Sequence, residues 1–210
     1  MTARVLRAAA ELALTAGVLS LFFTAYLLVG EPVVVSETQQ KLDGDLGRMW
    51  RAHVPPESRP SPGTPPVRAD GTPFVRLAIP ALGQHWTVVE GVSPAALRTA
   101  PGHYPSTTNP GEIGNFAVAG HRSSALFGDL DRIANGDVIT VETRDAVFTY
   151  TVYREEVVLP NDTRPIAPNP DMGYAGQPRA LLTLTTCEPK WDNSHRLIIH
   201  AELTQVHGKP

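Results

Sequence analysis

The chain has 210 residues, 42% of them hydrophobic and 19% charged, a balance that supports a globular core and excludes global disorder. Its net charge of −3 argues against nucleic-acid binding, and its single cysteine excludes an intramolecular disulfide or a cysteine-rich zinc site. Twenty prolines and seventeen glycines are too many for a helical bundle and indicate short strands joined by turns. The length predicts one compact domain with appendages, or at most two small domains.

An uncharged segment occupies residues 12–30, LALTAGVLSLFFTAYLLVG. As a helix it would span about 28 Å, close to the hydrocarbon thickness of a bilayer. Arg4 and Arg7 precede this segment, whereas the first charge after it is Glu31. By the positive-inside rule, residues 1–30 form a cytoplasmic tip and a single membrane anchor, and the rest of the chain is exported.

A cleaved signal peptide is the competing interpretation of the same segment. Its apolar region would be shorter, and a small-x-small cleavage site would follow it. The residues at that point are Val29, Gly30, Glu31 and Pro32, and the proline makes cleavage unfavourable. A buried core helix is a third interpretation, and the uncleaved anchor is favoured over both.

Residues 31–73 are predicted to form an extracytoplasmic stalk. Residues 36–39 (SETQ) have the pattern of a capping box, which predicts that a short helix begins there. One face of this helix is apolar and consists of Leu42, Leu46, Met49 and Trp50. Seven prolines between residues 55 and 73 favour extended conformations and predict a semi-rigid spacer.

Residues 74–210 are predicted to form the folded domain, with the last strand ending near Thr204. Seven segments rich in β-branched or aromatic residues are candidate strands, at residues 75–79, 86–90, 116–120, 138–143, 147–153, 179–185 and 196–202. Two short helices are predicted at residues 94–99 and 124–132. So many short strands in about 130 residues predict an all-β barrel or sandwich.

The lone cysteine, Cys187, follows a strongly β-branched segment and precedes a loop that contains Pro189. This position predicts a thiol at the rim of the sheet, although a buried structural cysteine is the competing interpretation. His121 also follows an apolar strand, so its imidazole is expected where that strand ends. Arg196 begins the next strand after Cys187, which predicts that a hairpin-like return places its side chain opposite the thiol.

Cysteine, histidine and arginine each have a role if the reaction is acyl transfer. The Cys187 thiolate would attack a carbonyl and form a thioester. His121 would protonate the departing amine and deprotonate the incoming one, while Arg196 would stabilise the oxyanion. His195 is the second choice for the base. The remaining histidines are interpreted as stalk, tail, surface or core residues: His53, His85, His103, His200 and His207.

Residues 183–187, TLTTC, resemble the TLxTC motif of sortases, the membrane-anchored cysteine transpeptidases of Gram-positive bacteria. The order of His121, this motif and Arg196 matches the family, as does an N-terminal anchor. Residues 101–105 (PGHYP) and 115–122 (NFAVAGHR) are similar to class E sortases of high-GC actinobacteria. The alanine- and proline-rich composition is typical of such a source.

The resemblance implies an eight-stranded β-barrel with short helices and a groove at the strand ends. Cys187 would cleave a C-terminal sorting signal, Leu-Ala-x-Thr-Gly in class E, between Thr and Gly on secreted proteins. The acyl group would then pass to an amine on lipid II or on a peptidoglycan stem peptide. Tyr104, Thr185 and Thr186 are expected to bind the signal. For Tyr104 the resemblance implies selection of alanine over proline at the second position, since only alanine keeps a backbone N–H.

Residues 70–74, DGTPF, differ from the Asp-Pro-aromatic lid motif of class C sortases, which favours a housekeeping anchoring role over pilus polymerisation. The calcium-site carboxylates of some class A sortases cannot be traced in this chain, so neither a metal nor another cofactor is predicted. The expected location is the cell membrane, with the catalytic domain outside the cytoplasm.

Two alternatives belong to other classes. A different secreted cell-wall cysteine peptidase or an L,D-transpeptidase would also use cysteine and histidine, but those families surround the cysteine with Ser-x-Gly-Cys, which this chain lacks. A non-catalytic barrel that only binds wall peptides would be expected to lose one of the three chemical groups, and Cys187, His121 and Arg196 are all present.

Overall fold

The computed structural model describes residues 2–52, 68–171 and 178–209, except for the side chains of residues 2 and 25–31. A long helix, α1 (Thr2–Arg51), precedes the strands. The strands are β1 (Pro73–Ile79), β2 (Gln84–Glu90), β3 (Gly102–His103), β4 (Gly114–Ala119), β5 (Val138–Glu142), β6 (Ala146–Val158), β7 (Ala180–Glu188) and β8 (His195–Gly208). Short helical turns connect some of them: η2 (Pro80–Leu82), α2 (Pro94–Leu97), η3 (Leu130–Arg132) and η4 (Arg164–Ile166).

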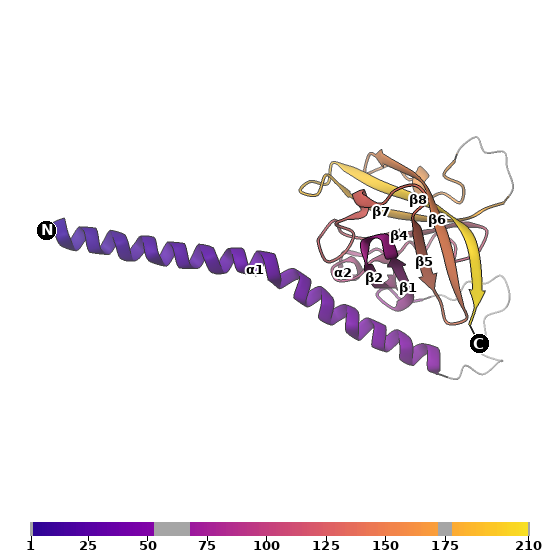
Figure 1. Ribbon diagram of the computed structural model, residues 1–210, viewed down its shortest axis with the longest axis horizontal. Coiled ribbons are helices and arrows are strands. Elements are labelled where there is room, and N and C mark those ends of the chain that lie inside the picture. Colours follow the sequence, from indigo (N-terminus) through magenta and orange to yellow (C-terminus); the bar gives the residue numbers. More distant parts are fainter. Residues whose placement is uncertain (1, 53–67, 172–177, 210) are drawn as a thin grey trace.

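The eight strands close into a barrel in the order β1-β2-β3-β4-β7-β8-β6-β5 (Figure 1). This confirms the all-β fold and the eight-stranded barrel implied by the family resemblance. Two pairings are parallel, β2 with β3 and β4 with β7, and the other six are antiparallel. The parallel pairing of β4 with β7 is the one that joins two distant parts of the sequence at the candidate site.

Side chains from alternate positions of the strands fill the barrel interior. In β7, Leu182 and Leu184 are fully buried in the main hydrophobic core, together with Phe116 of β4 and Tyr150 of β6. Each such side chain contributes about 1.5–3 kcal/mol relative to an exposed position. Residues of opposite parity in β7, including Thr183 and Thr185, therefore face the outside of the barrel wall.

The predicted elements differ from the observed ones mainly in length. β6 and β8 are longer than expected because they pair with one another from Ala146↔Gly208 to Val158↔Arg196. β3 is an additional strand of two residues, held by β2 on one side and β4 on the other. The helix expected at residues 124–132 is reduced to η3, and the one expected at 94–99 is the single turn α2.

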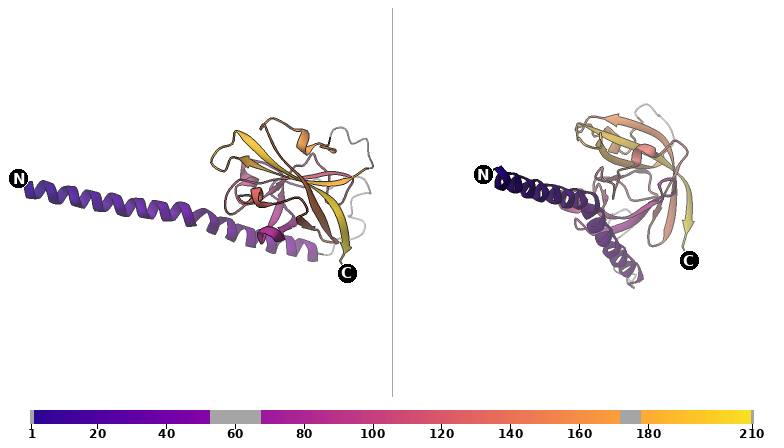
Figure 2. Two further views of the ribbon diagram at one scale, coloured as in Figure 1. Left: turned by 45° about the horizontal axis from the view of Figure 1, so that its top comes forward. Right: turned by 60° about the vertical axis from the view of Figure 1, so that its left-hand side comes forward.

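Helix α1 runs without a break across the expected end of the anchor and across the predicted capping box. Pro32 lies inside it, and the expected helix start at residue 36 lies in its interior. The second half of α1 packs against the barrel, where Val35 and Leu46 are 4% and 1% exposed (Figures 1 and 2). Gln39 adds a polar contact, since its Oε1 accepts a hydrogen bond from Thr87 N at 2.7 Å. The anchor and the first part of the predicted stalk thus share one helix, and most of the proline-rich spacer lies outside the described residues.

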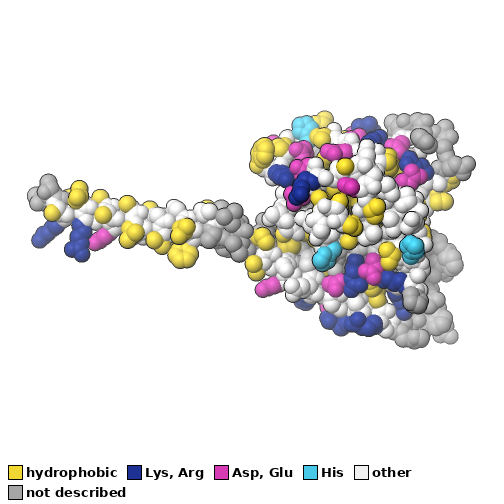
Figure 3. Space-filling model, viewed as in Figure 1, with side chains coloured by type: hydrophobic (Ala, Val, Ile, Leu, Met, Phe, Trp, Pro, Cys, Tyr) yellow, Lys and Arg dark blue, Asp and Glu magenta, His cyan; other side chains and the backbone are white. Residues whose placement is uncertain are grey.

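The first half of α1 projects away from the barrel (Figure 1). Residues Ala3–Thr24 are long and apolar enough to cross a membrane, and they are not buried against the rest of the protein. Hydrophobic side chains cover much of this part, with basic side chains near its N-terminal end (Figure 3). This segment overlaps the predicted anchor at residues 12–30, of which the side chains after residue 24 are not described.

Candidate active site

Cys187 lies near the end of β7, on the outer face of the barrel wall. It has the same parity as Thr183 and Thr185, opposite to the core residues Leu182 and Leu184. Its side chain is free and half-buried. A thiol in this position is accessible to a substrate, unlike a cysteine packed in the core.

Arg196 faces Cys187 across the antiparallel pair of β7 and β8, because the register pairs these two residues directly. Directly opposed residues place their side chains on the same face, with Cβ atoms about 5 Å apart. The guanidinium is held by its own loop, since Nη1 donates to the carbonyl oxygens of Asn193 at 2.9 Å and His195 at 2.8 Å. The register therefore places the residue that carries this fixed positive charge directly opposite Cys187.

His121 is brought to the same end of the barrel by the parallel pair of β4 and β7. The register pairs Ala119 with Thr185, and Gly120 N donates to Thr185 O at 3.0 Å. His121 follows β4 by two residues, just as Cys187 follows Thr185 by two residues on β7, so both lie at the same end of this strand pair. The imidazole is exposed, and Gly120 before it has no space for a side chain, because a Cβ there would lie 2.6 Å from the buried Phe127 ring.

Tyr104 and Thr185 also meet on this outer face. The phenolic oxygen of Tyr104 lies 3.2 Å from Thr185 Oγ1, and Tyr104 N donates to Ala117 O of β4 at 3.0 Å. Thr186 is not brought to this group. It has the parity of the core residues, is 2% exposed, and its hydroxyl has no hydrogen-bond partner among the described residues.

The segment that carries Tyr104 is fastened by a buried group that the sequence analysis did not single out. His103 Nδ1 lies 3.0 Å from Glu90 Oε1, and its Nε2 lies 3.1 Å from Thr107 Oγ1. Thr107 Oγ1 in turn donates to the carbonyl oxygen of Tyr104 at 2.8 Å. Burial lowers the pKa of His103, and Glu90 opposes that shift. These contacts fix the backbone at Tyr104.

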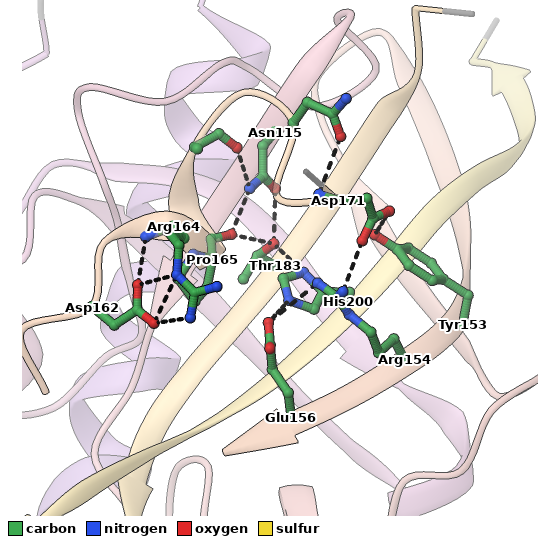
Figure 4. A network of polar contacts seen from close by, with 12 residues as sticks. Asn115, Tyr153, Arg154, Glu156, Asp162, Arg164, Pro165, Asp171, Thr183 and His200 are labelled. Atoms are coloured by element: carbon green, nitrogen blue, oxygen red, sulfur yellow. Dashed lines mark hydrogen bonds and ion pairs between the residues drawn. The ribbon is translucent and has the colours of Figure 1, made fainter. Parts of the chain in front are cut away.

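A second polar group lies further along β4 and β7 (Figure 4). Thr183 Oγ1 lies 2.9 Å from Asn115 Oδ1 and 3.0 Å from His200 Nδ1, and His200 Nε2 lies 2.9 Å from Glu156 Oε1. Hydroxyl, imidazole and carboxylate have the order of a hydrolytic triad, but Thr183 is fully buried. Burial lowers the pKa of His200, with Glu156 opposing the shift. We assign this group a structural role.

The structural role is visible in what Asn115 holds. Its Nδ2 donates to the carbonyl oxygens of Pro165 and Ala167, both at 2.9 Å, and so fastens the turn η4 over β4 and β7. The turn belongs to the connection between β6 and β7. No local sequence pattern indicates this network, because its members come from five separate elements, β4, β6, η4, β7 and β8.

Comparison with known proteins identifies the family. A family model described as the sortase domain matches residues 77–204. Sortase SrtE1 of Streptomyces coelicolor is 30% identical over 218 aligned positions, covering 97% of this chain and 60% of the relative. Sortase SrtE2 of the same organism is 30% identical over 210 positions, covering 93% and 81%. The structure of sortase E from Streptomyces avermitilis has a TM-score of 0.60 at 35% identity and covers 68% of this chain and 97% of that one.

The chain belongs to the sortase family, whose members are cysteine transpeptidases. The names of these relatives confirm the predicted resemblance to class E within that family. The chain spans 60% of the length of SrtE1 and 81% of the length of SrtE2.

Proposed function

We propose that the protein is a membrane-anchored transpeptidase in which Cys187 is the nucleophile, His121 the acid and base, and Arg196 the oxyanion donor. The observation that supports this proposal is the strand register, which pairs Cys187 with Arg196 and pairs β4 with β7 up to two residues before His121 and Cys187. The half-buried thiol, the exposed imidazole and the loop-held guanidinium are consistent with these roles.

The first half of the reaction forms a thioester. The Cys187 thiolate attacks the carbonyl carbon of the scissile bond, and N–H groups of Arg196 donate to the oxyanion that develops. The C–N bond then breaks, and the His121 imidazolium gives its proton to the departing amine. The acyl group is left on the sulfur, and the imidazole is neutral.

The second half transfers the acyl group to an amine. The acceptor nitrogen attacks the thioester carbonyl while His121 takes a proton from it. The C–S bond breaks, which restores the thiolate and imidazolium and releases the new amide. We infer that the acceptor is an amine of lipid II or of a peptidoglycan stem peptide.

The donor substrate in this proposal is a secreted protein with a C-terminal Leu-Ala-x-Thr-Gly signal, cleaved between Thr and Gly. The position of Tyr104 supports its part in recognition, since its hydroxyl lies beside Thr185, two residues before Cys187 on the same face. A phenolic oxygen there can accept the N–H of an alanine residue, which a proline residue lacks.

We also propose that α1 holds the enzyme in the cell membrane with its N-terminus in the cytoplasm. The apolar segment Ala3–Thr24 and the preference for basic residues on the cytoplasmic side support this topology. The predicted division at residues 30 and 73 into anchor, stalk and catalytic domain remains part of the proposal. Because α1 continues from the apolar segment onto the barrel, the anchor would also orient the catalytic end relative to the membrane.

Product analysis with the full-length protein in detergent tests the proposal. A labelled Leu-Ala-x-Thr-Gly peptide and an amine acceptor are added, and the products are weighed by mass spectrometry. Transfer of the fragment ending in Thr to the amine is the expected result. Hydrolysis with no transfer at saturating amine would favour a cell-wall peptidase, and binding without any turnover would favour a non-catalytic barrel.

A further inference from the structure

The strand pairing that brings His121 to Cys187 stops short of both residues. β4 and β7 pair in register up to Ala119↔Thr185, and the next backbone hydrogen bond, from Gly120 N to Thr185 O, is the last between these segments. Beyond it, His121 O accepts a hydrogen bond from Phe127 N of its own loop. Another contact must therefore set the separation of the two segments at the level of the imidazole and the thiol.

An ion pair joins the two segments at that level. Arg122 follows His121, Glu188 follows Cys187, and Arg122 Nη2 lies 3.1 Å from Glu188 Oε2. The guanidinium is 3% exposed, whereas the Glu188 side chain is 31% exposed. The pair thus joins the residue after the predicted base to the residue after the predicted nucleophile.

The buried Arg122 guanidinium is not expected to stabilise the folded protein. Transfer of a guanidinium out of water costs several kcal/mol, and a buried ion pair repays this cost only when its remaining donors are satisfied. Nε and Nη1 of Arg122 have no hydrogen-bond partner in the described part of the chain. An apolar side chain of similar length would fill the same space at lower cost, so a different property accounts for an arginine here.

A second contact leads from the same guanidinium to the next loop. Arg122 Nη2 lies 3.4 Å from Asp131 Oδ1 in η3, and Asp131 Oδ1 lies 3.4 Å from Lys190 Nζ. Asp131 is 42% exposed, comparable to Glu188. The two carboxylates contact the same nitrogen, but only Glu188 is adjacent to Cys187 in the chain.

We propose that Arg122 and Glu188 are positioning residues that hold the His121 imidazole at its working distance from the Cys187 thiol. The inference rests on the proposed function, because it needs these two groups to react together. Geometry at this level matters, since a displacement of about 1 Å can cost about 10²-fold in rate. The ion pair joins the segment after β4 to the last residue of β7, beyond the point where the backbone pairing of these strands ends.

Matched neutralisation of the two carboxylates in the full-length protein tests this proposal. Glu188→Gln should lower kcat for transpeptidation at least about tenfold with KM within about twofold. Asp131→Asn removes a carboxylate from the same Arg122 nitrogen and should leave kcat within about twofold. Urea midpoints should shift by similar small amounts in both variants. Equal losses of kcat in both, or a change confined to KM, would overturn the proposal.

A double-mutant cycle gives a second test. Arg122→Met alone should lower kcat about as much as Glu188→Gln, and the double variant should be no slower than either, since one link is broken in all three. Additive losses would assign separate roles to the two residues. A wild-type protein without turnover would instead overturn the proposed function itself.

Alkylation of the lone cysteine by iodoacetamide tests the positioning role separately from the proposed function, because alkylation needs no turnover. By charge alone, removing a carboxylate beside Cys187 favours the thiolate and would accelerate alkylation. Displacement of the imidazole predicts the opposite, a slower reaction in Glu188→Gln and an unchanged one in Asp131→Asn. Faster alkylation of Glu188→Gln would overturn the positioning role even if the protein proved inactive on every peptide.

Discussion

Replacement of Arg196 by lysine keeps the positive charge and removes the planar fork. The guanidinium has five N–H donors, and Nη1 uses its two on the carbonyl oxygens of Asn193 and His195, at 2.9 and 2.8 Å. Three donors, on Nε and Nη2, remain for a substrate. A lysine ammonium has three N–H groups in all, so it would have one left after making the same two bonds.

The expected decrease in kcat follows from the number of N–H donors that the substitution removes. Loss of one oxyanion donor costs about 10²–10³ in kcat, or about 2.7–4 kcal/mol. We predict a loss of this size for Arg196→Lys, with KM changed by less than about threefold because the oxyanion exists only in the transition state. The free energy of unfolding should change by less than about 0.5 kcal/mol, since the side chain is half-buried at the barrel rim.

Steady-state kinetics of the full-length protein with a Leu-Ala-x-Thr-Gly peptide measure both constants, and urea unfolding measures stability. Arg144→Lys is the matched control, because Arg144 lies in the turn between β5 and β6, at the other end of the β6–β8 ladder from Arg196. A kcat within about threefold of the wild-type value in Arg196→Lys would refute the oxyanion role and leave Arg196 a structural residue of its loop.

Three further predictions follow from the same contacts. Tyr104→Phe should narrow the kcat/KM preference for Leu-Ala-x-Thr-Gly over Leu-Pro-x-Thr-Gly, by about tenfold to a hundredfold and mainly through a slower alanine substrate, since an unmet hydrogen bond costs about 1–3 kcal/mol; equal losses on both peptides would show that Tyr104 does not recognise this position. The pKa of His200 is lowered by burial, so the unfolded chain takes up its proton first as pH falls below about 6.5. Urea unfolding should therefore show full stability above that pH and a decline below it. The loss of stability with falling pH should be shallower in His200→Asn, where His103 still contributes. An equal slope in the wild type and in His200→Asn would show that His200 is not buried in its neutral form. Protease added to spheroplasts should digest the barrel and spare an epitope at Thr2, and the reverse pattern would invert the proposed topology.

Local patterns in the sequence were enough to predict that Cys187 and Arg196 lie opposite one another. Cys187 and Arg196 flank a loop with turn-forming residues, and the two apolar strands on either side can pair only across that loop. Burial does not alternate in this strand, because residues 181–186 are all buried, and this is why Thr186 was expected at the site although it has the parity of the core residues. The register that opposes Cys187 to Arg196 follows from these short-range features.

The remainder depends on tertiary contacts that no local pattern encodes. The parallel pairing of β4 with β7 joins segments more than sixty residues apart, and the Asn115 network draws on five elements. The capping-box pattern at residues 36–39 led to the prediction of a stalk helix separate from the anchor, and a proline inside a helix, such as Pro32, costs about 3 kcal/mol. Burial of Val35 and Leu46 against the barrel and the hydrogen bonds of Gln39 stabilise the continuous helix instead.

The central claim is that Cys187 carries the acyl group, and the intact mass of the protein tests it most directly. The full-length protein is mixed with a Leu-Ala-x-Thr-Gly peptide in the absence of an amine acceptor and quenched in acid. We predict an adduct equal in mass to the peptide fragment ending in Thr, located on Cys187 by proteolytic mapping, released by hydroxylamine and absent from Cys187→Ala. Cleavage of the peptide by Cys187→Ala, or turnover by the wild type with no adduct at any time, would contradict the thioester mechanism.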